Sequence, residues 1–148
     1  MAIREKLQED WIFALKAKDK VRANTISMAK AAVLQLEKSG PKKVEDSDVI
    51  DVIAREVKQR RESIIEFEKG KRQDLVDQYS KEIEILLDYL PQQLNDNEIY
   101  DLVKELAVEV GANSIKDLGK LMSVVTPKTK GRADGKKVNQ IVREFLNK

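Results

Sequence analysis

The residues best suited to binding chemistry in this chain are basic side chains near its C-terminal end. Five of them fall between positions 128 and 137: Lys128, Lys130, Arg132, Lys136 and Lys137. Ammonium and guanidinium groups in such a run can contact phosphates, which gives affinity without reading a base sequence. The same residues are also consistent with a solvated loop that binds nothing. The segment therefore predicts either a polyanion-binding turn or an ordinary surface.

A short amphipathic helix follows this turn. Its apolar positions fall at helical spacing: Val138, Ile141, Val142 and Phe145. Asp134 can cap the first turn, and the amides there would add donors and a partial positive charge. We expect Gly131 and Gly135 to allow backbone angles or close approaches that a Cβ would hinder, and we assign Gly119 to the same structural group. Arg143 completes the predicted binding set.

The charge of the chain is small but unevenly distributed. The formal net charge is +2, yet residues 116–148 carry nine basic and three acidic side chains. The preceding residues carry 19 basic and 23 acidic side chains. Such asymmetry is typical of a polyanion-facing end, and it also occurs in helical proteins with a lysine-rich tail.

A second basic group lies in the middle of the chain. Its predicted members are Lys58, Arg60, Arg61 and Arg72, with Lys69 and Lys71 nearby. Acidic residues are interleaved with these positions, so pairing four residues apart along a helix explains the group more simply than a second binding surface does.

Two absences from the composition narrow the chemistry. The sequence contains no cysteine and no histidine. This excludes thiolate and imidazole catalysis and the metal sites that need either ligand. Carboxylate pairs at helical spacing, such as Asp48 with Asp51, favour a solvated surface. We expect no metal, no cofactor and no catalytic residue. The first ten residues lack an apolar segment, so we expect a cytoplasmic protein without membrane contact.

Helical periodicity recurs along the whole chain, and no segment shows sustained alternation with a period of two. We predict helices over residues 2–18, 20–38, 47–69, 72–90, 96–110, 115–125 and 135–146. The expected fold is all-α, with a helical N-terminal domain of about four helices (1–93) and a small three-helix C-terminal domain (94–148).

Local signals set the predicted ends of these helices. Asp19 should cap the second helix, and Asp46 or Ser47 the third. Ser39-Gly40-Pro41 should end the second helix, followed by a polar linker over residues 42–45. Asn95 with Glu98 resembles a capping box, and residues 126–131 are expected to be a connector. Trp11 lies on an apolar face, which favours core packing over base stacking.

Several spaced motifs resemble the GatB/YqeY family. In the C-terminal part they are Leu118-Gly119-Lys120-Leu121-Met122, Gly131-Arg132-Ala133-Asp134 and Val138-Asn139. Upstream, residues 57–63 and 72–75 and Tyr89-Leu90-Pro91 look like the stand-alone members of the family. The match covers nearly the whole chain. The family pattern favours glycine at position 123, where this sequence has Ser123, a similarly small residue.

The resemblance implies a helical N-terminal domain followed by a domain similar to the tail of the tRNA-dependent amidotransferase B subunit. That tail helps to hold tRNA, while other parts of the enzyme transfer the amide of glutamine. The carbon–nitrogen ligase activity would then belong to the larger enzyme only. We therefore expect a non-catalytic accessory protein that binds tRNA or another structured RNA. The alternative is a protein–protein adaptor for an amidotransferase or an aminoacyl-tRNA synthetase, and an enzyme is the third possibility.

Overall fold

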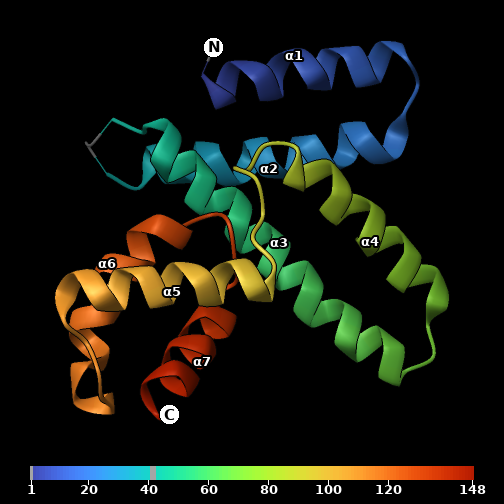
Figure 1. Cartoon of the computed structure of the whole chain (residues 1–148). Coiled ribbons are helices and arrows are strands. Elements are labelled where there is room, and N and C mark those ends of the chain that lie inside the picture. Colours follow the sequence, from blue (N-terminus) through green and yellow to red (C-terminus); the bar gives the residue numbers. More distant parts are fainter. Residues whose placement is uncertain (1, 41–42) are drawn as a thin grey trace. The chain divides into compact units, whose positions relative to one another are not determined.

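The computed structural model describes residues 2–40 and 43–148, and every regular element in this part of the chain is helical. The elements are α1 (Ile3–Lys16), α2 (Lys20–Lys38), α3 (Asp46–Lys69), α4 (Gln73–Leu87), α5 (Asp96–Val110), a 3₁₀ turn η1 (Ile115–Asp117), α6 (Leu118–Thr129) and α7 (Gly135–Leu146) (Figure 1). The prediction of an all-α chain is confirmed.

The helices form two compact units, Met1–Pro91 and Gln92–Lys148, which we call unit 1 and unit 2. In unit 1, α1 packs on α2, and α3 packs on α4 across the short turn at Gly70. α2 also contacts α3 and α4, which joins the two pairs around one core. The largest fully buried side chains there are Leu7, Ile26, Ile53 and Leu86.

A polar contact ties the last segment of unit 1 to its first helix. The Tyr89 hydroxyl donates a hydrogen bond to the Asp10 carboxylate. Burial, together with the neighbouring carboxylate of Asp10, raises the pKa of the Tyr89 hydroxyl. Tyr89 is buried in the cluster that also contains Leu86, so this bond fixes an aromatic ring within the core.

Unit 2 is a three-helix bundle in which α5, α6 and α7 each contact the other two. Its core is built from aliphatic side chains, with Val103, Leu121, Val125 and Val142 fully buried. η1 begins at a capping box of Ser114 and Asp117. Because the backbone N–H of Asn113, and secondarily that of Ser114, donates to the Asp117 carboxylate, the pKa of that carboxyl is lowered.

Several predicted helix ends are confirmed. Asp19 accepts a hydrogen bond from the Arg22 amide at 3.1 Å and caps α2. Asn95 and Glu98 form the expected capping box of α5. α2 ends at Lys38, directly before the predicted stop at residues 39–41. Pro41 of that stop and Lys42 of the predicted linker lie outside the described residues.

Three other predictions about helix ends are wrong. α3 is capped by Glu45, which forms a capping box with Asp48, so neither Asp46 nor Ser47 is the cap. α4 ends at Leu87, before the predicted position 90. α6 continues to Thr129 and includes Pro127, so most of the predicted connector is helix. Proline disfavours a helix interior, but this one lies in the last turn, where only the bond to the preceding turn is lost.

Candidate nucleic-acid interface

The turn between α6 and α7 carries the basic residues singled out by the sequence. We call Lys128, Lys130, Arg132, Lys136 and Lys137 the basic turn. Gly131 has φ +72°, a left-handed conformation that favours glycine, so its predicted structural role is confirmed. The Arg132 amide then donates to the Thr129 carbonyl at 2.8 Å. Thr129 is itself buried, which anchors the start of the turn in the core of unit 2.

The segment before α5 holds the turn from the other side. Gln93 donates through Nε2 to the Gly131 carbonyl at 2.7 Å. The Leu94 amide donates to the Arg132 carbonyl at 2.8 Å. Arg132 in turn donates through Nε to the Gln92 carbonyl at 3.0 Å. These bonds connect residues about forty positions apart in the sequence, so tertiary contacts hold the backbone of the basic turn in place.

The start of α7 is capped by the protein itself. The Asp134 side chain accepts a hydrogen bond from the Lys136 amide at 3.2 Å, as predicted. The carboxylate therefore occupies part of the helix end that could have offered amides to an anion. At this end a phosphate would meet the side-chain ammonium groups of Lys136 and Lys137 more readily than the backbone.

Two of the predicted structural glycines do not need to be glycine. Neither Gly119 nor Gly135 has a positive φ, and a Cβ built at either position meets no atom within 4 Å. Both lie at the beginning of a helix, α6 and α7 respectively, where an alanine would fit. The conformational argument made from sequence therefore holds for Gly131 and not for Gly119 or Gly135.

Most side chains of the basic turn face solvent. Arg132 is half-buried, and the four lysines are exposed. Lys137 forms an ion pair with Asp96 of α5 at 3.3 Å, a contact that water screens. Arg143 donates to Asn139 at 2.7 Å within α7. Because Arg143 follows Lys136 by two helical turns, it lies on the same exposed face of α7 and extends the basic surface.

The charges of unit 2 are sorted by helix. α5 carries five acidic residues and one lysine, Lys104. Residues 116–148, which include α6 and α7, carry nine basic and three acidic residues. Unit 2 is therefore acidic along α5 and basic over the segment that holds α6 and α7, and a polyanion would be attracted to the basic segment.

One member of the second predicted basic group, Arg60, is withdrawn into the core. Arg60 is buried, only 5% exposed, between α3 and α4. Its guanidinium donates to Glu82 at 2.9 Å and to Glu56 at 3.3 Å. Pairing along the helix, as interpreted from the sequence, accounts for the contact with Glu56, whereas the shorter contact with Glu82 joins α3 to α4. Both carboxylates keep the Arg60 guanidinium in the protein interior.

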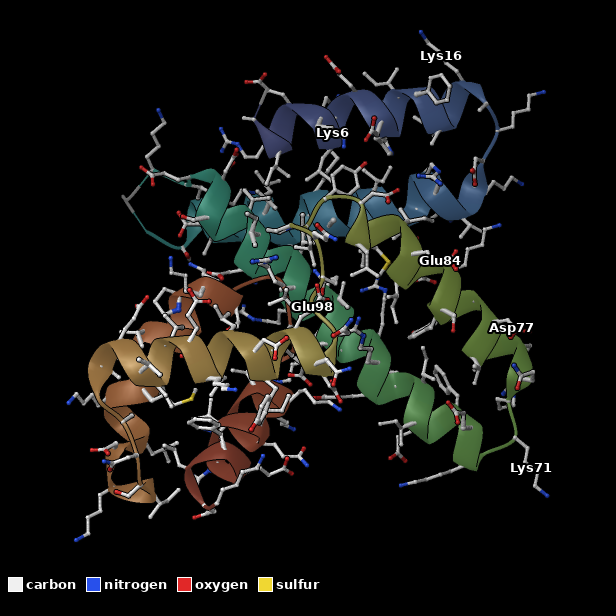
Figure 2. All side chains as sticks on the ribbon, in the orientation of Figure 1. Lys6, Lys16, Lys71, Asp77, Glu84 and Glu98 are labelled. Atoms are coloured by element: carbon white, nitrogen blue, oxygen red, sulfur yellow. The ribbon has the colours of Figure 1, made fainter. Side chains whose placement is uncertain are left out.

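The remaining members of that group differ in exposure. Lys58 is half-buried, whereas Arg61 is exposed. Arg72 lies at the turn into α4 and forms two hydrogen bonds with Asp74, at 3.0 and 3.1 Å. Lys71, with φ +56°, projects from the same turn (Figure 2). Arg61, Lys71 and Arg72 thus stay exposed, and Arg60 alone of the group is buried.

Aromatic side chains are used for packing. Trp11 packs against the core of unit 1, and the Lys30 ammonium lies 4.0 Å from the centroid of its ring. In unit 2, Tyr100 and Phe145 pack edge to face, with centroids 5.8 Å apart. The prediction of core packing for Trp11 is confirmed, and the described rings of unit 2 are occupied with each other.

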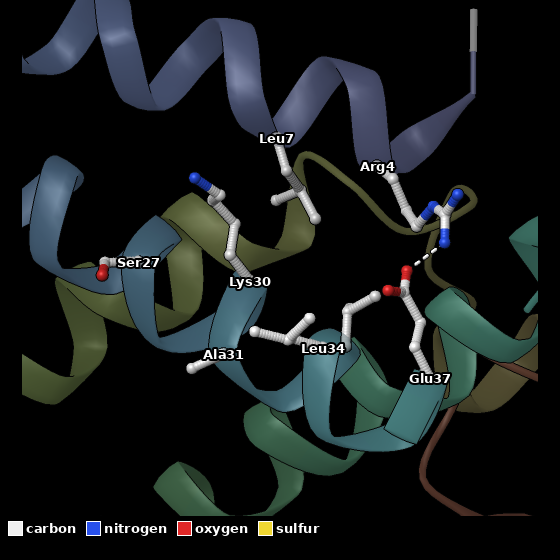
Figure 3. Close-up of a pocket in the computed structure, with 8 residues that line it drawn as sticks. Arg4, Leu7, Ser27, Lys30, Ala31, Leu34 and Glu37 are labelled. Atoms are coloured by element: carbon white, nitrogen blue, oxygen red, sulfur yellow. Dashed lines mark hydrogen bonds and ion pairs between the residues drawn. The ribbon is translucent and has the colours of Figure 1, made fainter. Parts of the chain in front are cut away.

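Unit 1 contains a separate apolar hollow of about 410 Å³ between α1 and α2. Figure 3 shows Leu7 and Leu34 facing it, with Lys30 toward one end. Arg4 and Glu37 form an ion pair at the other end. Leu34 is half exposed, so the hollow presents apolar surface to a partner. Its size and lining fit a site that receives a hydrophobic side chain.

Over residues 2–40 and 43–148, no group of three or more acidic side chains is placed to hold a metal ion. In the same residues, no helix combines the length and the apolar character needed to cross a bilayer.

The family of the chain follows from comparison with known proteins. A model of the YqeY-like protein family matches residues 4–146. The chain therefore belongs to the YqeY-like family, as the motifs around Gly119 and Gly131 indicated.

Curated relatives share this similarity over most of the chain. Altered inheritance of mitochondria protein 41, mitochondrial, from Pyrenophora tritici-repentis is 30% identical over 144 residues, which cover 95% of this chain and 79% of the relative. The protein of the same name from Lachancea thermotolerans is 29% identical and covers 96% of this chain and 80% of the relative. That from Kluyveromyces lactis is 38% identical over 84 residues, covering 56% of this chain and 45% of the relative.

The sequence did not reveal the groups that hold the basic turn. Gln92 and Gln93 were assigned only to a boundary between domains, and Asp96 only to the beginning of a helix. Their partners lie about forty residues away, and no local spacing reports a contact over that separation. The one signal in the sequence was that Gln92, Gln93 and Asp96 are polar residues close to the predicted domain boundary.

Proposed function

We propose that this chain is a non-catalytic accessory protein that binds structured RNA through unit 2, with tRNA the favoured ligand. The observation that carries the proposal is the basic turn, in which exposed lysines are mounted on a backbone fixed by Gln92, Gln93 and Leu94. A fixed array of cations loses little flexibility when it meets a polyanion, which favours binding.

The chemistry of this surface supports backbone recognition. Lysine contacts phosphate as a point charge, and contacts of this kind position a nucleic acid without reading its sequence. Tyr100 and Phe145 pack against each other. Among the described residues of unit 2, no other aromatic ring is present to stack on unpaired bases. A folded RNA that displays ordered phosphates suits this surface better than an extended single strand. The resemblance to an amidotransferase tail domain supports the same ligand.

The proposal assigns no reaction to the chain, and any carbon–nitrogen ligase activity would belong to a larger amidotransferase. The cytoplasm stays our predicted location, although the relatives' names place those proteins in mitochondria. A protein–protein adaptor for an amidotransferase or an aminoacyl-tRNA synthetase is the second candidate. The apolar hollow between α1 and α2, with half-exposed Leu34 on its wall, favours it.

Titration of a labelled tRNA with the purified chain tests the proposal. The test variant changes the five residues of the basic turn to glutamine. A matched control changes five exposed lysines of unit 1 to glutamine: Lys18, Lys20, Lys38, Lys69 and Lys71. Both variants lose five charges, so they alter the net charge equally.

We expect the basic-turn variant to bind roughly tenfold or more weakly at low salt, because each lost phosphate contact removes counterion release. The control should bind nearly as well as the unchanged chain. Equal losses in both variants would contradict a localised site, and no binding by the unchanged chain at low salt would move the search to protein partners.

A further inference from the structure

The outward face of α1 exposes an apolar centre in the C-terminal half of the helix. Ile12 is 40% exposed and Phe13 is 72% exposed, whereas Leu7 and Ala14 on the opposite face are buried. Phenylalanine is usually buried, so a side chain left this open in the last turn of α1 is a candidate contact residue.

Charged residues flank this apolar centre in a definite order. Glu9 lies one turn before it and Lys16 one turn after it, and both are exposed. Figure 2 shows Lys16 projecting away from α1. Glu9 and Lys16 are each about 3.5 residues from the midpoint between Ile12 and Phe13. This separation corresponds to about 5 Å along the helix axis. None of the described ion pairs includes either residue.

We propose that α1 forms an antiparallel contact with α1 of a second copy of this chain, with the two-fold axis between Ile12 and Phe13. A two-fold axis there places Ile12 opposite Phe13 of the other copy. It also places Glu9 opposite Lys16 of the other copy, and does so twice, once on each side of the axis. Such an interface is isologous, because the same patch serves both partners.

The order of charges favours a second copy over other occupants. An anionic membrane would be attracted by Lys16 and repelled by Glu9 and Glu5, which lie on the same face. An antiparallel copy satisfies both signs at once. The apolar centre and the charged rim also match the usual anatomy of a protein interface.

The contact is small because it uses one helix from each copy. Stable complexes bury about 800 Å² on each partner, which is more than a few side chains of one helix provide. The dimer therefore forms with rising protein concentration and dissociates on dilution. It involves unit 1 alone and does not depend on RNA binding by unit 2.

A charge exchange followed by sedimentation velocity over a range of concentrations tests the pairing. Glu9→Lys and Lys16→Glu should each weaken self-association, because each places like charges opposite one another. The double variant with both changes should restore self-association to within about threefold of the unchanged chain. Phe13→Asp should abolish it, whereas Val108→Asp, at an 80% exposed position of α5, should leave it unchanged. Circular dichroism checks that each variant remains folded.

A chain that stays monomeric up to its solubility limit would overturn the proposal. So would a double variant that is no better than either single variant. Binding of the monomeric chain to vesicles rich in anionic lipid, lost in Phe13→Asp, would overturn it in favour of a lipid partner.

Cysteine cross-linking locates the axis directly, because the chain contains no cysteine of its own. Ile12→Cys places two thiols beside the two-fold axis, within reach of a disulfide when the helices touch. Glu5→Cys places them about 22 Å apart along the helix axis in the same dimer. Mild oxidation should cross-link the first variant and not the second. Equal cross-linking of both, or of neither, would contradict this alignment.

Discussion

Removing Arg60 should destabilise unit 1 more than any other single change to a charged residue on α3. Arg60 is 5% exposed, and its partner Glu82 is 7% exposed. Glu82 accepts from Arg60 Nε at 2.9 Å and from Gln78 Nε2 at 3.0 Å. Arg60→Ala removes the only cation bonded to this buried carboxylate among the described residues.

The magnitude follows from the burial of the pair. Breaking a buried ion pair by removing one partner costs about 3–5 kcal/mol, because the other charge is left uncompensated. Glu56 is more exposed than Glu82 and can be rehydrated, so most of the cost arises at Glu82. A domain of this size has about 5–15 kcal/mol of stability in total. Arg60→Ala should therefore remove a large fraction of the stability of unit 1.

Urea denaturation followed by tryptophan fluorescence measures this effect in unit 1 alone. Trp11 is the one tryptophan of the chain and packs against the core of that unit. The control is Arg61→Ala, the next residue on the same helix, whose side chain is exposed. Its free energy of unfolding should change by no more than about 0.5 kcal/mol.

A double variant separates the cost of an unpaired charge from the cost of lost packing. Arg60→Met should destabilise strongly, whereas Arg60→Met combined with Glu82→Met should recover most of the loss, because the two apolar side chains fill a similar volume. A loss below about 1 kcal/mol for Arg60→Ala would refute the reasoning. A double variant as unstable as the single one would refute it too.

Three further predictions concern the backbone and titrating groups. Gly131→Ala should destabilise unit 2 by about 1 kcal/mol or more, because the φ of Gly131 is +72°. Gly135→Ala should be neutral or slightly stabilising, because an added Cβ meets no neighbouring atom there. Amide hydrogen exchange in α7 measures the change in stability of both variants. Tyr89→Phe should cost about 1 kcal/mol, since it removes the donor to Asp10, and no loss in the Trp11 fluorescence assay would show that this bond is not stabilising. The Asp117 carboxyl should titrate below its ordinary pKa of 3.8, because the Asn113 amide stabilises its charged form. The charged Asp117 carboxylate therefore contributes its full stabilisation above pH 3.8, and this stabilisation is lost as the pH falls through the lowered pKa. An NMR titration of Asp117, with Asp117→Asn as the comparison for stability, checks this.

The helices were predictable from sequence because their signals are local. Apolar spacing placed α7, and Asp19, Asn95 and Asp134 were correctly assigned as caps from their side chains and positions. Errors arose where tertiary context overrode a local rule. Residues 126–131 were expected to be a connector, but α6 continues to Thr129, and its last turn tolerates Pro127.

The candidate site was predicted only in part. The identity of the basic residues is visible in the sequence. The sequence does not distinguish Gly131, which has a positive φ, from Gly119 and Gly135, which do not. The burial of Arg60 is not visible in the sequence either, because its partner Glu82 lies 22 residues away on another helix. The fixing of the basic turn by Gln93 was hidden for the same reason. A charged residue in a sequence does not show whether its partner is water, ligand or a distant carboxylate.

The most direct test of RNA binding by unit 2 is the salt dependence of tRNA affinity. If about four phosphates are engaged by the basic turn, the logarithm of the binding constant should fall with the logarithm of salt concentration with a slope of roughly −3 to −4. The variant with all five residues of the basic turn changed to glutamine should bind more weakly and with a clearly shallower slope. A slope near zero for the unchanged chain, or an unaltered slope in the variant, would contradict phosphate binding at this turn.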